Sequence, residues 1–195
     1  KHVKNLQSFG QTVVIAFNKF ATDTDEEIEV LRKHCEEMGC GFAVNSAFAE
    51  GGNGAIELAN LVVKTIDERP SAPLYFAYDD NDTVEEKIEK VAFNLYGAGS
   101  VTLSDSAKAM IEEIKKLGAE KFPICIAKTQ YSFSTDAKAY GPTEGFELHA
   151  RDITVNMGAE MIVVIAGPIM RMPGLPKSPQ AERIDVVNGE ITGLS

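Results

Sequence analysis

The chain has 195 residues, of which 44% are hydrophobic and 8% aromatic, enough for one sizeable core or two small ones. Its 29 acidic side chains outnumber its 19 basic ones, and the net charge of −10 disfavours nucleic acid and anionic membrane as nonspecific partners. No apolar run approaches the roughly 20 residues of a membrane span, so we expect a cytoplasmic protein. The sequence starts at Lys1 rather than methionine, and we interpret it as a piece of a longer chain.

The first part of the chain predicts alternating strands and helices. Residues 13–17 are apolar and largely β-branched, which is typical of a central parallel strand with helices on both faces. Thr24 and Glu27 have the spacing of a capping box, so a helix is expected to begin there and to end at Gly39. Its core-facing positions are Ile28, Leu31, Cys35 and Met38.

A second strand and a second helix complete a β-α-β-α unit. We expect the strand at residues 41–45, a loop at 46–54 and the helix at 55–66. The core-facing stripe of this helix is predicted to be Leu58, Leu61, Val62 and Ile66. Pro73 and an aspartate-rich cluster at 79–82 mark a change of composition over residues 71–82, so we predict two domains, residues 1–72 and 73–195.

Two more helices follow the predicted boundary. Thr83 and Glu86 form a second capping box, before a helix that is expected to end at Gly97. Ser104 is an N-cap candidate for the next helix, which should end at Gly118.

The rest of the chain predicts mixed or antiparallel strands. Residues 123–127 form a buried-type strand that ends at Lys128, residues 147–156 alternate between apolar and polar, and residues 161–166 are fully apolar. An Asn-Gly pair, Asn188 and Gly189, is a hairpin signal.

Ligands in open α/β sheets bind beyond the carboxyl ends of the strands, so the residues after the first strand are candidates for a site. Asn18, Lys19 and Asp23 superficially resemble the guanine-reading loop of GTPases, but the aspartate comes one residue late. A GTPase also needs a Gly-Lys phosphate loop, and no Gly-Lys pair exists in this chain.

Glycines 51, 52 and 54 precede the second helix, where backbone amides such as those of Gly52 and Gly54 could hold an anion. A flexible loop that enters a helix explains them equally well. The three cysteines are odd in number and are expected to be reduced thiols. His34, Cys35 and Cys40 lack a second pair of ligands, so no metal site is expected.

Phe20 and Phe48 each lie just beyond the carboxyl end of a predicted strand. Because neighbouring strands of one sheet often follow each other in sequence, both rings could overhang one crevice and clamp a flat heterocycle. The alternative is that each phenylalanine belongs to a core or to a subunit contact.

Four strings make the sequence similar to a known family. Residues 14–24, 49–54, 126–132 and 169–176 resemble, in this order, the C-terminal third of formate–tetrahydrofolate ligases. The last string is a Pro- and Gly-containing connector that suits a loop lining a site and a plain turn alike.

The resemblance implies an ATP-dependent C–N ligase of one-carbon metabolism with an α/β fold. Its β-α-β-α unit would belong to a mostly parallel, P-loop-type sheet, followed by a smaller α/β subdomain with mixed strands. In the family, formate attacks ATP to give formyl phosphate, and N10 of tetrahydrofolate then attacks its carbonyl. Mg²⁺ would accompany ATP, a monovalent cation is possible, and the full-length protein is expected to be a homo-oligomer.

The same resemblance assigns the folate site. The pterin would lie between Phe20 and Phe48, with Ala21 beside the first ring and Val44 at the edge. The second wall is usually a tryptophan in the family, and this chain has none.

The family's P-loop and its catalytic lysine and arginine belong to the N-terminal two thirds. We therefore expect no catalytic residue, no bound cofactor and no ligase activity in this chain alone. A stand-alone folate-binding or interaction module remains the alternative.

Overall fold

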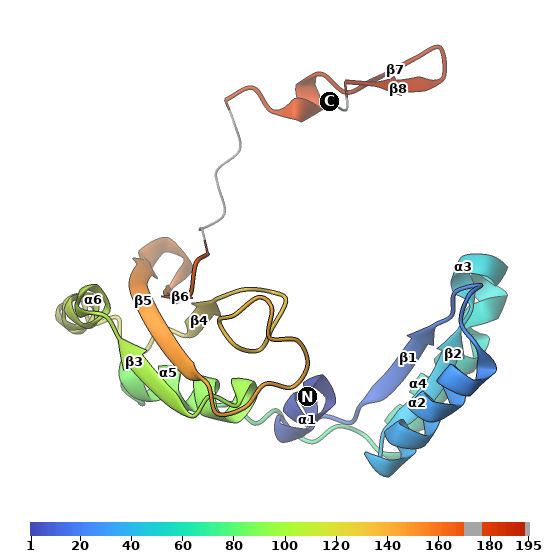
Figure 1. Cartoon of the computed structure of the whole chain (residues 1–195), viewed down its shortest axis with the longest axis horizontal. Helices are drawn as coiled ribbons and strands as arrows, with labels where there is room; N and C mark the ends of the chain where they lie inside the picture. The colour runs from blue at the N-terminus through green and yellow to red at the C-terminus, as the bar shows by residue number, and fades with distance from the viewer. Residues whose placement is uncertain (170–176, 194–195) are drawn as a thin grey trace.

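The computed structural model describes residues 1–169 and 177–193, and it is α/β. The described strands form one parallel pair, one mixed four-stranded sheet and one small hairpin. Figure 1 shows the parallel pair and the four-stranded sheet as two separate groups of elements, with α1 (His2–Ser8) between them. The predicted division at residue 72 stays a prediction.

The first group, here called the β1–β2 unit, contains the predicted β-α-β-α order. β1 (Val14–Asn18) pairs in parallel with β2 (Gly41–Asn45), as expected. α2 (Asp25–Glu37) begins at the predicted capping box, where Glu27 N–H donates to Thr24 Oγ1 over 3.2 Å. Gly39 follows the helix with a φ of 70°, which glycine adopts without strain.

The segment after β2 is more regular than expected. The predicted loop contains a one-turn helix, α3 (Ala47–Glu50), and a 3₁₀ turn, Gly51–Ala55, before α4 (Ile56–Glu68). Glycine-rich sequence reads as a loop, but the Ser46 N–H donates to the Gly54 carbonyl and closes the segment on itself.

The two faces of the β1–β2 pair are covered by different helices. Phe42 and Val44 pack with Ile28 and Cys35 of α2, whereas a Cβ at Gly41 would meet Leu61 of α4. Both helices lie mainly over β2.

The prediction that β1 is covered on both faces is wrong for the described chain. No residue of β1 is fully buried, and Leu31, Val62 and Ile66, expected in the core, are exposed. The reason is that β1 is an edge strand among the described residues, because only β2 pairs with it. The apolar side chains of α2 and α4 that extend beyond β1 therefore have no described strand to pack on.

The second group, the four-stranded unit, has the strand order β3-β5-β6-β4. Its strands are β3 (Ser100–Leu103), β4 (Ile124–Ala127), β5 (Glu147–Asn156) and β6 (Met161–Ala166). The outer pairs are parallel and the central pair, β5 with β6, is antiparallel, which confirms the mixed strands. β3 was not predicted.

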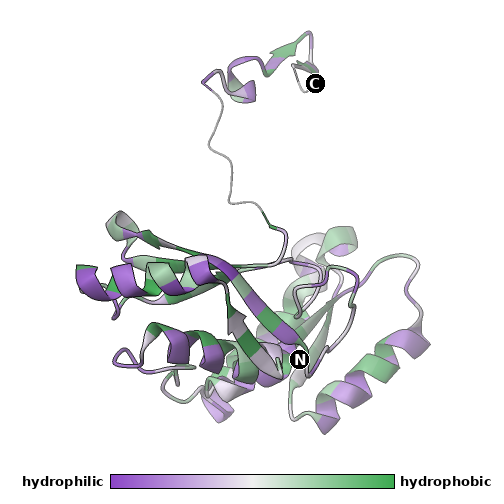
Figure 2. Ribbon diagram, turned by 60° about the vertical axis from the view of Figure 1, so that its left-hand side comes forward, coloured by the Kyte–Doolittle hydropathy of each residue, from purple (hydrophilic) through white to green (hydrophobic). Residues whose placement is uncertain are grey.

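Two helices cover one face of this sheet. α5 (Val84–Val91) starts at the predicted capping box and continues through a π-helical turn, Ala92–Tyr96, to Gly97. α6 (Asp105–Leu117) is capped by Ser104 and ends at Gly118, as expected. Figure 2 shows both helices with bands of hydrophilic and hydrophobic colour, as expected of helices that pack one side on a sheet.

The C-terminal described residues form a hairpin. After a 3₁₀ turn, Gln180–Glu182, β7 (Asp185–Val187) pairs with β8 (Glu190–Thr192). Positive φ angles at Asn188 and Gly189, 53° and 85°, fit the predicted turn. Most of the predicted connector at 169–176 lies outside the described residues. None of the described helices is long and apolar enough to cross a membrane.

Candidate functional site

The parallel register of β1 and β2 brings the candidate residues to one end of the sheet. Asn18 is directly opposite Asn45, the Asn45 Nδ2 donates to Asn18 Oδ1 over 2.9 Å, and the Lys19 N–H donates to the Asn45 carbonyl over 3.0 Å. Both strands therefore end together, and the segments that follow them leave from the same edge.

Lys19 does not point into an anion site in the described chain. Its Nζ lies 3.3 Å from an Asp25 carboxylate oxygen; the Asp25 side chain is almost fully exposed and the Lys19 side chain is partly exposed. Such a pair contributes little to stability, so Lys19 can exchange Asp25 for another anion at small cost.

Phe20 is held out of the protein by a short turn. Its N–H donates to the Asp23 carboxylate over 2.7 Å, and the Asp23 N–H donates back to the Phe20 carbonyl over 3.1 Å. The Phe20 side chain is 61% exposed, and Ala21 beside it is exposed as well. The turn fixes the backbone and leaves most of Phe20 exposed to solvent.

Phe48 lies in α3 and is 94% exposed. Because Asn45 Oδ1 accepts from the Ala47 N–H over 3.2 Å, the start of α3 is tied to the end of β2. Val44 is half-buried and packs with the α2 side of the sheet. The structure thus puts Phe20, Ala21, Val44 and Phe48 at one sheet end, and whether they bind one ligand stays a prediction.

The glycines after α3 have different roles. A Cβ at Gly54 would lie 2.5 Å from the Ser46 carbonyl carbon, so only glycine permits this close approach. A Cβ at Gly52 would meet nothing. The close approach to Ser46 explains why position 54 is glycine. Nothing near position 52 requires a glycine, and anion binding at Gly52 stays a prediction.

The cysteines are free, as expected, and burial raises the pKa of the Cys35 thiol. Residues 1–169 and 177–193 contain no group of three or more His, Cys, Asp or Glu side chains that could hold a metal ion.

Sequence patterns did not reveal a cavity that is lined by the start of α1, by Tyr96 and by the segment after β4. Its volume is about 530 Å³, and residues after β4, among them Lys128 and Tyr131, line it. The sequence indicated only that Lys128 follows a strand. The cavity itself depends on how residues 128–142 fold against Tyr96 and the start of α1, which local sequence patterns do not show.

Comparison with known proteins agrees with the resemblance. The family model described as formate–tetrahydrofolate ligase matches residues 1–195. The chain is 64% identical to a formate–tetrahydrofolate ligase of Bacteroides fragilis and 64% identical to one of Phocaeicola vulgatus, over 100% of this chain and 35% of each relative. A relative from Campylobacter curvus is 48% identical, over 100% of this chain and 36% of the relative.

The match covers every residue of the chain, whereas the chain spans about a third of the length of these relatives. On this evidence the chain belongs to the formate–tetrahydrofolate ligase family.

Proposed function

We propose that this chain supplies the folate-binding wall of an ATP-dependent formate–tetrahydrofolate ligase. The observation that carries the proposal is the pair of exposed rings, Phe20 and Phe48, beyond the carboxyl ends of two strands in register. Two exposed rings at one sheet end can stack on a flat ligand, and a pterin stacked on such rings gains about 1–3 kcal/mol per ring by analogy with nucleic-acid bases.

The open side of the β1–β2 unit supports a role within a larger protein. One groove beside β1 is lined by Val14, Val62 and Ile66, and another by Phe17 and Val30. The two grooves lie on opposite faces of the β1–β2 pair, because Val14 is on the face that α4 covers and Phe17 is on the face that α2 covers. A parallel sheet is stable when both faces are covered, so we expect a further strand of a P-loop-type sheet to pair with β1.

The nucleotide site is proposed to lie mainly outside this chain. No Gly-Lys pair provides a phosphate-binding loop here, and Asn18, Lys19, Gly52 and Gly54 remain only candidates for holding an anion. ATP, Mg²⁺ and a monovalent cation are therefore assigned to parts of the ligase outside this chain, as is the phosphoryl-transfer chemistry. The full-length protein is proposed to be a homo-oligomer.

A direct assay tests whether this chain alone lacks ligase activity. The chain is incubated with ATP, magnesium, formate and tetrahydrofolate, and no 10-formyltetrahydrofolate is expected. Turnover well above background would contradict the proposal and require a phosphate site within these residues.

A pair of variants in the full-length ligase tests the wall. Phe48→Ala should weaken tetrahydrofolate binding by about 1–3 kcal/mol and leave ATP affinity unchanged, and Phe48→Trp should be tolerated. Phe20→Ala should raise the KM for tetrahydrofolate at least about tenfold, which corresponds to about 1.4 kcal/mol. Phe76→Ala is the control, since Phe76 is also exposed but lies away from this sheet end.

The alternative function, a folate-binding or interaction module without ligase activity, makes a different prediction. In that case the chain alone would bind tetrahydrofolate through Phe20 and Phe48, and adding the rest of the ligase would change nothing. Equilibrium dialysis of tetrahydrofolate against the chain and against the full-length protein separates the two functions.

A further inference from the structure

The loop after β4 surrounds Lys128, which pairs with no carboxylate of the described residues. Lys128 Nζ donates to the carbonyl of Thr129 over 3.3 Å and to the carbonyl of Ser132. It also lies 4.7 Å from the centre of the Tyr96 ring. No ion pair among the described residues includes Lys128. Burial without a countercharge lowers the pKa of this ammonium.

The loop is held in place by buried hydroxyl groups rather than by the lysine alone. Ser132 Oγ donates to the Ala139 carbonyl over 2.7 Å and lies 2.9 Å from Ser134 Oγ. The Ser134 N–H donates to Ser132 Oγ, and the Asp136 N–H donates to Ser134 Oγ. Ser132 and Ser134 are both buried, so the wall of the cavity is preformed.

The cavity of about 530 Å³ beside Lys128 has the size and the composition of a small-molecule site. Its lining contains the rings of Tyr96, Tyr131 and Phe133, and its basic residues are Lys1, His2 and Lys128. No aspartate or glutamate lines it, although acidic residues outnumber basic ones by 29 to 19 in the chain.

We propose that this cavity binds an organic carboxylate with a planar body, whose carboxylate pairs with the Lys128 ammonium and whose body packs against the rings of Tyr96 and Phe133. Two of the three ammonium N–H groups already bond to carbonyls, which leaves one for a ligand. A single remaining ammonium donor beside aromatic rings suits a carboxylate better than a phosphate, whose larger charge and three oxygens need several donors around one point.

Two ligands of the ligase family's reaction carry carboxylates, formate and the benzoylglutamate half of tetrahydrofolate. Only the second has a planar body. The probe is therefore p-aminobenzoyl-L-glutamate, which lacks the pterin and so reports on this cavity independently of Phe20 and Phe48. Sodium formate and sodium chloride at equal ionic strength form the other two arms.

The experiment is a titration of the ¹⁵N-labelled 195-residue chain followed by two-dimensional NMR. We expect saturable shifts at residues 128–133 and at Gly141 with p-aminobenzoyl-L-glutamate, at least about tenfold weaker binding of formate, and no saturation with chloride. Nuclear Overhauser effects between the probe's ring protons and Tyr96 or Phe133 should appear in the unaltered chain.

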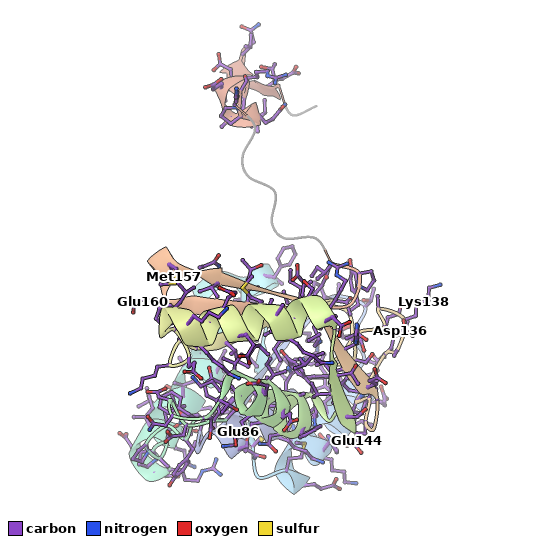
Figure 3. The ribbon with its side chains drawn as sticks, turned by 90° about the vertical axis from the view of Figure 1, so that its left-hand side faces the viewer. Glu86, Asp136, Lys138, Glu144, Met157 and Glu160 are labelled. Atoms are coloured by element: carbon purple, nitrogen blue, oxygen red, sulfur yellow. The ribbon has the colours of Figure 1, made fainter. Side chains whose placement is uncertain are left out.

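Three variants identify the lysine's part. Lys128→Gln should weaken binding of p-aminobenzoyl-L-glutamate at least about tenfold. Lys128→Arg should retain most of the affinity because it keeps the charge. Lys138→Gln is the matched control, since Lys138 is in the same loop and projects away from the protein in Figure 3.

Several results would overturn the proposal. They are no saturable shift with the probe, equal binding of probe and formate, or full binding by Lys128→Gln. Unchanged β4 and β6 signals in that variant show that the sheet is intact. If the variant disturbs the sheet, the Overhauser contacts in the unaltered chain decide by themselves, and their absence contradicts the proposal.

Discussion

The two α/β units of this chain differ in how completely their cores are closed. In the four-stranded unit, the core side chains of Ile88, Ile111, Ile114 and Leu148 are 0–1% exposed. In the β1–β2 unit, the corresponding residues Ile28, Cys35 and Phe42 are 7–9% exposed, and large apolar side chains of both helices stay on the surface.

The arrangement of strands explains the difference. The four-stranded sheet has an antiparallel centre and exposes Glu147 and His149 on its outer face, so it needs helices on one face only. The β1–β2 pair is parallel and apolar, and it needs cover on both faces and a neighbour beside β1. The core of one unit is thus closed among the described residues, while the other unit leaves large apolar side chains of both helices on its surface.

Truncating a core isoleucine in each unit gives the largest expected contrast. Ile111→Ala should lower the free energy of unfolding by about 2–5 kcal/mol, because a closed core cannot collapse around the cavity. Ile28→Ala should cost less, since its unit is open and relaxes more easily. Urea unfolding followed by circular dichroism measures both, and equal losses would contradict the contrast.

The buried lysine of α5 tests the closed unit further. Lys87 is fully buried, and its Nζ donates to the carbonyls of Glu120 and Phe122 over 2.7 and 3.3 Å. Lys87→Met should destabilise the chain by about 1–3 kcal/mol because both acceptors lose their donor. Lys90→Met on the same helix removes a pair with Asp82 in which the lysine is partly exposed to solvent, and it should cost less than Lys87→Met. A larger loss from Lys90→Met would refute this account.

The same difference decides what the sequence could predict. Capping boxes, the hairpin turn and the limits of β2 depend on neighbours in the chain, and those predictions are confirmed. β3 was missed because it has only four residues, Ser100–Leu103, and so short a polar–apolar alternation does not stand out in the sequence. The predicted burial of Val62 and Ile66 failed because a helical stripe shows which side is apolar, not whether anything covers it.

For the candidate site, too, the sequence predicted local features but not contacts between distant segments. The positions of Phe20 and Phe48 beyond strand ends followed from local patterns, and both rings are exposed as a ligand wall requires. The cavity beside Lys128 was not predictable, because it joins Tyr96 with a loop more than thirty positions later in the chain. Such a contact leaves no periodic signal in sequence.

The two capping boxes allow a matched comparison at smaller scale. The Thr24 and Thr83 hydroxyls each accept a backbone N–H over 3.2 Å, so the local geometry is the same in both units. Either threonine to alanine should cost about 0.5–2 kcal/mol. Thr83→Ala should lower global stability, whereas Thr24→Ala should mainly speed amide hydrogen exchange in α2, because the open unit unfolds locally first. Identical exchange patterns in the two variants would remove the distinction between the units.

Acid titration gives the smallest expected effect. Hydrogen bonds from the backbone N–H and hydroxyl of Thr24, at 2.9 and 3.1 Å, lower the pKa of the Glu27 carboxyl below its ordinary value of 4.5. A carboxyl whose pKa is lower in the folded state stabilises the fold above pH 4.5, and this contribution is lost as the pH falls through the folded-state value. Glu27→Gln keeps a hydrogen-bonding group at this position but cannot titrate, so hydrogen exchange in α2 should lose part of its acid sensitivity. If α2 in Glu27→Gln responds to acid as strongly as in the unaltered chain, the cap does not control the first turn of the open unit, and other carboxylates must account for its response to acid.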